Sequence, residues 1–143
     1  MVFDFKSGVK WVQGVIGKTT VGDVVELEFA LPKEFGGEEG YVKPQELLMS
    51  SLLTCFSATL WRLLREKGVE LKGYAADVVG SVNKDEEGYN SFLEAVISVK
   101  ILLANEIDRL KVERALELSE KYCPVGRAIR GNMKLKFEVS ITA

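Results

Sequence analysis

A long apolar helix is the strongest constraint that this 143-residue sequence places on its fold. Pro44 opens the helix, because proline suits the first helical turn, and neither glycine nor proline recurs before Gly68. Between Leu47 and Leu64 the segment is apolar on nearly all sides, which is typical of a buried helix. One sheet covers only one face of a helix, so we expect a second source of cover.

Length and composition indicate a single soluble domain, residues 1–143, with 47% hydrophobic and 28% charged residues. The net charge is −2, and the sequence shows neither the excess of basic residues typical of nucleic-acid binding nor a polybasic segment for an anionic membrane. The uncharged stretch 47–61 has 15 residues, fewer than the ~20 that span a bilayer. The N-terminus lacks an apolar core of signal-peptide length. We therefore expect a cytoplasmic protein with neither a nucleic-acid nor a membrane partner.

Alternating and β-branched runs on both sides of the helix predict strands. These strands are 9–16, 24–31, 71–82, 91–103 and 133–142. The glycine-rich stretch 32–43 is expected to be a loop, and 83–88 a polar hairpin turn. Apolar spacing predicts a second helix over 106–122, followed by a short helix over 125–130. The buried face of the helix over 106–122 is expected to contain Ile107, Leu110, Ala115, Leu118 and Tyr122. The element order predicts an α+β fold with a mainly antiparallel sheet.

Two patterns suggest ligand sites by spacing alone. A calcium-loop pattern runs through the hairpin turn, but both of its flanks are strand-like, so we interpret it as a solvated turn. Its positions are Asn83, Asp85, Glu87, Gly88 and Glu94. The glycines in 14–17 lack the remaining residues of a phosphate-binding loop.

The two cysteines are the candidate reactive side chains of this sequence. The chain has no histidine, which excludes histidine triads, bases and metal ligands, and two cysteines cannot complete a four-ligand zinc site. Cys55 lies in the middle of the long helix. Cys123 precedes Pro124 at the expected start of the short helix, where the helix dipole favours a thiolate. Spacing alone leaves open whether the two are a redox pair or inert buried residues.

The residues around both cysteines resemble the OsmC/Ohr family of osmotically inducible and organic-hydroperoxide-resistance proteins. The resemblance rests on the run Pro-Gln-Glu-Leu-Leu at 44–48, Cys55 eleven residues after the proline, and Cys123-Pro124-Val125. Segments 9–14 and 115–123 are most similar to an OsmC-like branch. The resemblance implies an α+β, OsmC-like fold built as an intertwined homodimer around two central helices, which would supply the missing cover.

The resemblance also implies an activity, thiol-dependent reduction of organic hydroperoxides in protection against oxidative stress. Cys55 is then the attacking thiol, and Cys123 resolves the oxidised product as a disulfide. An external dithiol or lipoyl-type reductant resets the pair, and no bound cofactor or metal is implied.

Two departures from the family pattern concern the activation of Cys55. Gln45 stands where the active peroxidases carry glutamate, and Glu46 lies about 100° further around the helix. Those enzymes also use an N-terminal arginine, whereas no arginine here precedes Arg62. Arg127, four residues after Cys123, is another candidate cation. We expect a less activated thiol, with Gln45, Glu46 and Arg127 as supporting residues.

The alternative is a dimer of the same fold without enzymatic activity. It would bind an apolar small molecule at the subunit interface, and Cys55 would be inert packing. The pocket lining would then include Met49, Leu52, Phe56 and Trp61.

Overall fold

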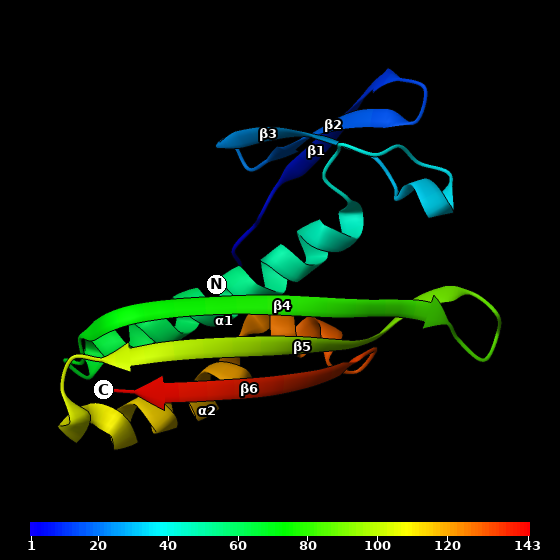
Figure 1. Ribbon diagram of the computed structural model, residues 1–143. Coiled ribbons are helices and arrows are strands. Elements are labelled where there is room, and N and C mark those ends of the chain that lie inside the picture. Colours follow the sequence, from blue (N-terminus) through cyan, green and yellow to red (C-terminus); the bar gives the residue numbers. More distant parts are fainter. The chain divides into compact units, whose positions relative to one another are not determined.

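The protein is described by a computed structural model that covers residues 1–143. The residues form two compact units, Met1–Leu48 and Met49–Ala143. Each unit contains one three-stranded sheet (Figure 1). The combination of helices with mainly antiparallel strand pairing confirms the expected α+β class.

The N-terminal unit is an antiparallel meander of β1 (Ser7–Gln13), β2 (Ile16–Val21) and β3 (Val25–Phe29). The prediction of one strand over 9–16 and no strand over 16–21 was wrong. The chain turns at Gly14, whose φ of 50° favours glycine, and β2 starts two residues later. Glycine is required at position 17 of β2 because a Cβ there would lie 2.7 Å from the ring of Phe29. A 3₁₀ turn, η1 (Lys33–Phe35), interrupts the following loop.

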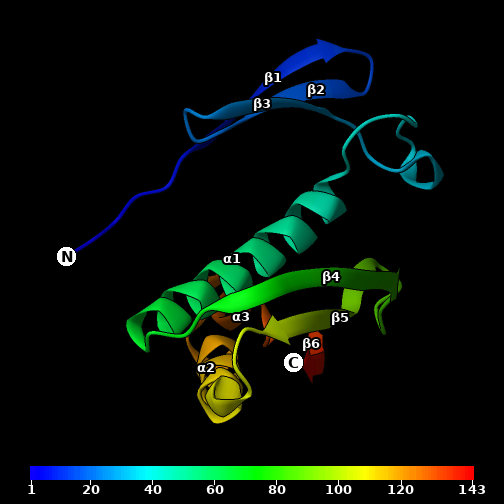
Figure 2. The same ribbon diagram turned by 60° about the vertical axis from the view of Figure 1, so that its left-hand side comes forward.

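The C-terminal unit has three helices on one face of its sheet (Figure 2). The sheet consists of β4 (Leu71–Lys84), β5 (Asn90–Leu103) and β6 (Lys134–Thr142) in that order. The helices are α1 (Pro44–Glu66), α2 (Arg109–Tyr122) and α3 (Pro124–Ile129), with a 3₁₀ turn, η2 (Glu106–Asp108), before α2. β4 pairs with β5 antiparallel, whereas β6 pairs with β5 in parallel, because α2 and α3 form a crossover between them.

The core of this unit lies between β5 and one face of α1. Alternate β5 residues are buried, as expected for a strand with one covered face: Ala95, Ile97, Val99, Ile101 and Leu103. From α1, the buried side chains follow the helical repeat: Met49, Leu52, Phe56, Leu60 and Leu64. Phe56 also packs on Phe137 of β6, with ring centroids 5.1 Å apart. Gly80 of β4 admits Met49, whose Sδ lies 2.5 Å from where a Cβ at Gly80 would be.

The hairpin turn between β4 and β5 confirms the turn predicted over 83–88, except that Asn83 and Lys84 still belong to β4. The carboxylate of Asp85 accepts hydrogen bonds from the backbone N–H groups of Glu87 and Tyr89 and from the Ser91 hydroxyl. These bonds lower the pKa of Asp85. The carboxylate therefore organises the loop.

The predicted buried face of α2 was correct at Ala115, which is buried, and partly so at Leu118, which is half-buried, but it was wrong at the other three positions. Ile107 and Leu110 are exposed at 80% and 77%, and Tyr122 is also exposed. The buried residues instead follow the spacing i, i+3, i+4, i+7: Val112, Ala115, Leu116 and Ser119. Ser119 fits inside because its hydroxyl donates to the carbonyl of Ala115 at 2.7 Å.

Candidate functional site

Cys55 lies at the border between two faces of α1. The sheet-facing side carries Leu52 and Phe56, which are 1% exposed, whereas Thr54 and Ala58 lie on the uncovered side. Cys55 itself is half-buried and has a free thiol. A thiol at this border is held by the core and is still partly accessible to a reactant.

Cys123 occupies the junction between α2 and α3 and is 2% exposed. Its backbone N–H donates to Ser119 O at 3.0 Å and closes α2. Its Sγ accepts the N–H of Gly126 at 3.4 Å, so the side chain is the N-cap of α3. Pro124 follows at the first helical position, where a missing N–H costs nothing. The break between the helices therefore fixes the position of the sulfur.

The fold brings the two cysteines together although 68 positions separate them in the sequence. The Cys55 side chain is a hydrogen-bonding neighbour of the Cys123 thiol, and both sulfurs are free. The pKa of Cys123 is raised to about 11, chiefly by burial and also by the hydrogen bond and charge of Cys55, whereas the backbone N–H groups of Gly126 and Val125 lower it. Cys123 therefore stays protonated at neutral pH.

The three supporting residues have different surroundings. Glu46 accepts the backbone N–H of Lys43 at 3.0 Å and pairs with its ammonium at 3.6 Å, so it stabilises the start of α1. Gln45 has a buried Oε1 atom without a hydrogen-bond donor. Arg127 is exposed on α3 and forms no ion pair. None of the three side chains forms a hydrogen bond or ion pair with either cysteine.

Of the four residues expected to line an apolar pocket, three lie in the core. Met49, Leu52 and Phe56 are at most 8% exposed, whereas Trp61 is 52% exposed and borders a cavity. Sequence reasoning missed the hydrogen bond between Ser57 and Tyr74, with oxygens 2.7 Å apart. The available signal was a hydroxyl on the buried face of an apolar helix, which requires a partner.

No group of three or more His, Cys, Asp and Glu side chains is arranged to hold a metal ion. The long helix α1 is the one helix that is long and apolar enough to cross a membrane. The core helix of a folded domain has the same length and composition. Its sheet-facing side is occupied by the core described above.

Known proteins match this chain in sequence and in fold. Organic hydroperoxide resistance protein OhrB of Bacillus subtilis (strain 168) is 24% identical over 131 residues, which cover 88% of this chain and 90% of OhrB. Uncharacterized protein YmaD of the same organism is 26% identical over 129 residues, covering 88% of this chain and 85% of YmaD. An OsmC-like protein from Mycoplasma pneumoniae superposes with a TM-score of 0.83 at 18% identity, over 100% of both chains.

The family model described as OsmC-like protein matches residues 36–138, most of the chain. An organic hydroperoxide resistance protein OsmC from Legionella pneumophila has a TM-score of 0.79 at 22% identity, over 98% of each chain. The structural matches confirm the OsmC fold expected from the sequence. The chain therefore belongs to the OsmC/Ohr family.

Proposed function

We propose that the protein is a thiol peroxidase that reduces organic hydroperoxides with Cys55 and Cys123. The observation that carries this proposal is the contact between a half-buried and a fully buried cysteine from distant parts of the chain. Relatives named for organic hydroperoxide resistance support the choice of substrate class. The proposed location is the cytoplasm, where structural disulfides are rare and thiols are kept reduced.

The difference in burial between the two thiols supports different roles for them. Cys55 is the partly accessible sulfur, so its thiolate attacks one peroxide oxygen. The O–O bond breaks, one oxygen stays on Cys55 as a sulfenic acid, and the alkoxide takes a proton from the solvent and leaves as the alcohol ROH. Cys123 then attacks the Cys55 sulfur, the S–S bond forms, and the hydroxyl leaves as water. An external dithiol or lipoyl-type reductant restores both thiols by disulfide exchange and is itself oxidised.

The same proposal includes a homodimer. All seven residues of β1 are exposed, among them Val9 and Trp11, and three short strands with so little buried area are marginal alone. On α1 an uncovered face recurs at helical spacing through Thr54, Ala58 and Trp61. A second copy of the chain would cover these surfaces, as an intertwined dimer requires.

Slow turnover is also part of the proposal. Gln45 replaces the acidic residue of the complete enzymes, and no arginine precedes Arg62. The buried side-chain carbonyl oxygen of Gln45 has no hydrogen-bond donor, which supports the view that no arginine pairs with the Gln45 side chain. The thiolate of Cys55 then lacks the usual bidentate cation.

The test is consumption of cumene hydroperoxide by the reduced protein with a dithiol in excess. We expect Cys55→Ser to abolish turnover. Cys123→Ser should consume about one equivalent and then stop as a sulfenic acid, which a dimedone adduct in mass spectrometry would identify. Thr54→Ser, on the exposed face beside Cys55, is the matched control and should behave as the parent. Unchanged turnover in Cys55→Ser would overturn the proposal.

A further inference from the structure

The bend between α2 and α3 orients the buried sulfur of Cys123. Cys123 has φ −59° and ψ 113°, an extended conformation between two helices. The residue before a proline is disfavoured from the α-helical region, so Pro124 maintains this conformation. The backbone N–H of Cys123 ends α2 on Ser119 O at 3.0 Å, and its carbonyl begins α3 by accepting the N–H of Arg127 at 2.9 Å. The two helices therefore change direction at Cys123.

Pro124 also leaves a carbonyl group of α2 without its helical donor. In a continuous helix the N–H of residue 124 would donate to the carbonyl of Glu120, but proline has no N–H. The guanidinium of Arg130 supplies this hydrogen bond instead, from Nη2 to Glu120 O. Arg130 follows α3, and its own backbone N–H closes that helix on Gly126 O at 3.0 Å. The Arg130 side chain therefore joins the end of α3 to the last turn of α2, across the bend.

The contact of Arg130 with α2 is not explained by an ion pair. Arg130 forms none, and neither does the Glu120 carboxylate. Burial raises the pKa of the Glu120 carboxyl, and the charge of Arg130 partly offsets this increase. Arg130 and Pro124 are both exposed, and exposed substitutions usually change stability little. Their effect on the bend can therefore be separated from an effect on the core.

The bend affects the cysteine pair because α3 lies against α1. A Cβ at Gly126, in the first turn of α3, would lie 3.6 Å from the Cys123 sulfur and 3.9 Å from Leu52 of α1. The N–H of Gly126 donates to the same sulfur at 3.4 Å. Cys55, the hydrogen-bonding neighbour of Cys123, follows Leu52 by one helical turn. A rotation of α3 about the bend would therefore move the Cys123 sulfur relative to Cys55.

We propose that Arg130 is a positioning residue for the cysteine pair: together with Pro124, it fixes the bend that places the Cys123 sulfur next to Cys55. Arg130 forms no hydrogen bond with either sulfur and acts through the backbone of α2 and α3. The proposal rests on the redox role proposed for the pair. A less restrained bend lowers the effective concentration of one thiol at the other, and with it the yield and the rate of disulfide formation.

The test is equilibration of the two thiols with glutathione buffers, followed by alkylation and mass spectrometry. Glutathione disulfide accepts two electrons, the Cys55–Cys123 disulfide forms, and two glutathione thiols are released. Arg130→Met removes the hydrogen-bond donors but retains a long side chain. It should lower the equilibrium constant about three- to tenfold, as expected for the loss of one hydrogen bond. Arg130→Lys, whose ammonium can still donate to Glu120 O, should recover most of this loss.

Pro124→Ala should lower the equilibrium constant as well, because Cys123 is then free to adopt a helical conformation. Two controls should leave the constant unchanged. Arg114→Met makes the same change on α2, where the arginine pairs with Glu117 at 2.8 Å and does not cross the bend. Glu120→Gln removes the carboxylate but keeps the backbone carbonyl that Arg130 contacts.

The reaction with cumene hydroperoxide gives a second readout. Arg130→Met should form the Cys55 sulfenic acid at the rate of the parent but convert it to the disulfide more slowly. More of the sulfenic acid should therefore be trapped by dimedone. A general loss of stability would not separate these two steps.

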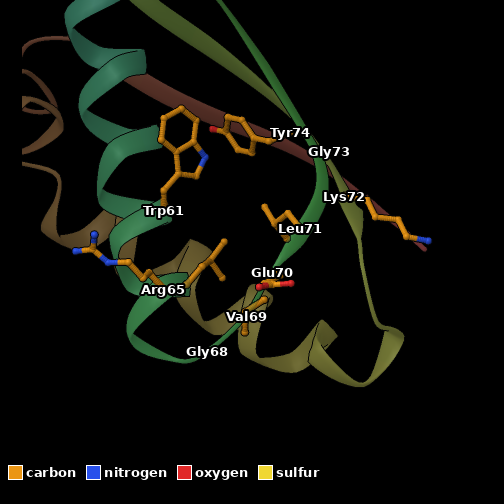
Figure 3. A pocket seen from close by; sticks show the side chains of 10 residues that line it. Trp61, Arg65, Gly68, Val69, Glu70, Leu71, Lys72, Gly73 and Tyr74 are labelled. Atoms are coloured by element: carbon orange, nitrogen blue, oxygen red, sulfur yellow. The ribbon is translucent and has the colours of Figure 1, made fainter.

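The fluorescence of Trp61 in α1 reports whether the variants are folded. In a Trp11→Phe background Trp61 is the only tryptophan. Its ring meets the ring of Tyr74 edge to face, with centroids 5.3 Å apart (Figure 3). Emission equal to that of the parent shows that α1 and β4 remain packed together.

Equilibrium constants equal to that of the parent in folded Arg130→Met and Pro124→Ala would overturn the proposal. An equal decrease in Arg114→Met would also overturn it, as would failure of the parent to form the disulfide with glutathione. A parent that forms this disulfide but does not reduce cumene hydroperoxide would contradict the proposed function alone, because exchange with glutathione requires no peroxidase activity.

Discussion

Replacing Cys123 with alanine should make the protein less sensitive to alkaline pH. The fold raises the pKa of Cys123 from its ordinary value of 9.0 to about 11, chiefly because the thiol is buried and also because Cys55 lies beside it. Below pH 9 the thiol is protonated in both the folded and the unfolded chain, so its full contribution to stability is present. Between pH 9 and 11 the unfolded chain ionises first, and the free energy of unfolding falls until the contribution is lost above pH 11.

The size of this effect follows from the change in pKa. An increase from 9.0 to about 11 corresponds to about 2.7 kcal/mol. Urea unfolding with reductant, at one protein concentration and at pH 8, 9, 10 and 11, gives the free energy of unfolding for the parent and for Cys123→Ala. The parent should lose about 2.3 kcal/mol more than the variant between pH 8 and pH 11, and the full difference of about 2.7 kcal/mol only above pH 11. The loss of the N-cap in the variant is independent of pH and leaves this difference unchanged.

Cys55→Ala provides a graded comparison, because it removes the hydrogen bond and charge of Cys55 but leaves Cys123 buried. Its loss of stability with pH should be smaller than that of the parent and larger than that of Cys123→Ala. Parallel pH curves for the parent and Cys123→Ala would refute the reasoning. Such a result would mean that the thiol is hydrated in the folded protein.

Three further predictions concern packing, hydrogen bonding and assembly. Phe56→Ala should cost about 3–5 kcal/mol in urea unfolding, because the ring is 1% exposed and packs on Phe137, whereas Thr54→Ala on the exposed face should cost about 0.5 kcal/mol. Tyr74→Phe should destabilise by about 1–3 kcal/mol because it leaves the buried Ser57 hydroxyl without its partner, and a double-mutant cycle with Ser57→Ala should show coupling of about 1 kcal/mol. Sedimentation at micromolar concentration should give twice the chain mass of 15.9 kDa, and a folded monomer would contradict the proposed dimer.

Long periodic segments made much of the fold predictable. The helix α1 begins at Pro44 as expected, and β4, β5 and β6 differ from the predicted strands by at most two residues at each end. Strand β2, which was not predicted, contains Gly17, Lys18 and two threonines, so its sequence shows little apolar alternation. Its formation depends on pairing with β1 and β3, which is a tertiary effect.

The candidate site was predictable only in part. The two cysteines and the break before Pro124 are visible in the sequence, but periodicity cannot show that this break places the Cys123 sulfur against the middle of α1. The exposed α2 residues Ile107 and Leu110 illustrate the same limit, because apolar spacing does not reveal which face has a neighbour to pack against. The contact between the cysteines requires the parallel crossover through α2 and α3, a non-local feature of the fold.

The position of Cys55 on α1 links the reactivity of its thiol to packing on both sides of the helix. Leu52 and Phe56 anchor the sheet-facing side of α1 in the core next to Cys55, whereas Thr54 and Ala58 lie on the uncovered side that we propose a second chain occupies. A core substitution should therefore impair disulfide formation through loss of the Cys55–Cys123 contact. A substitution on the uncovered side that changes side-chain size, unlike the conservative Thr54→Ser, should instead change how freely peroxide and reductant reach Cys55. The two kinds of variant separate resolution from access, although both lie within one turn of the same cysteine.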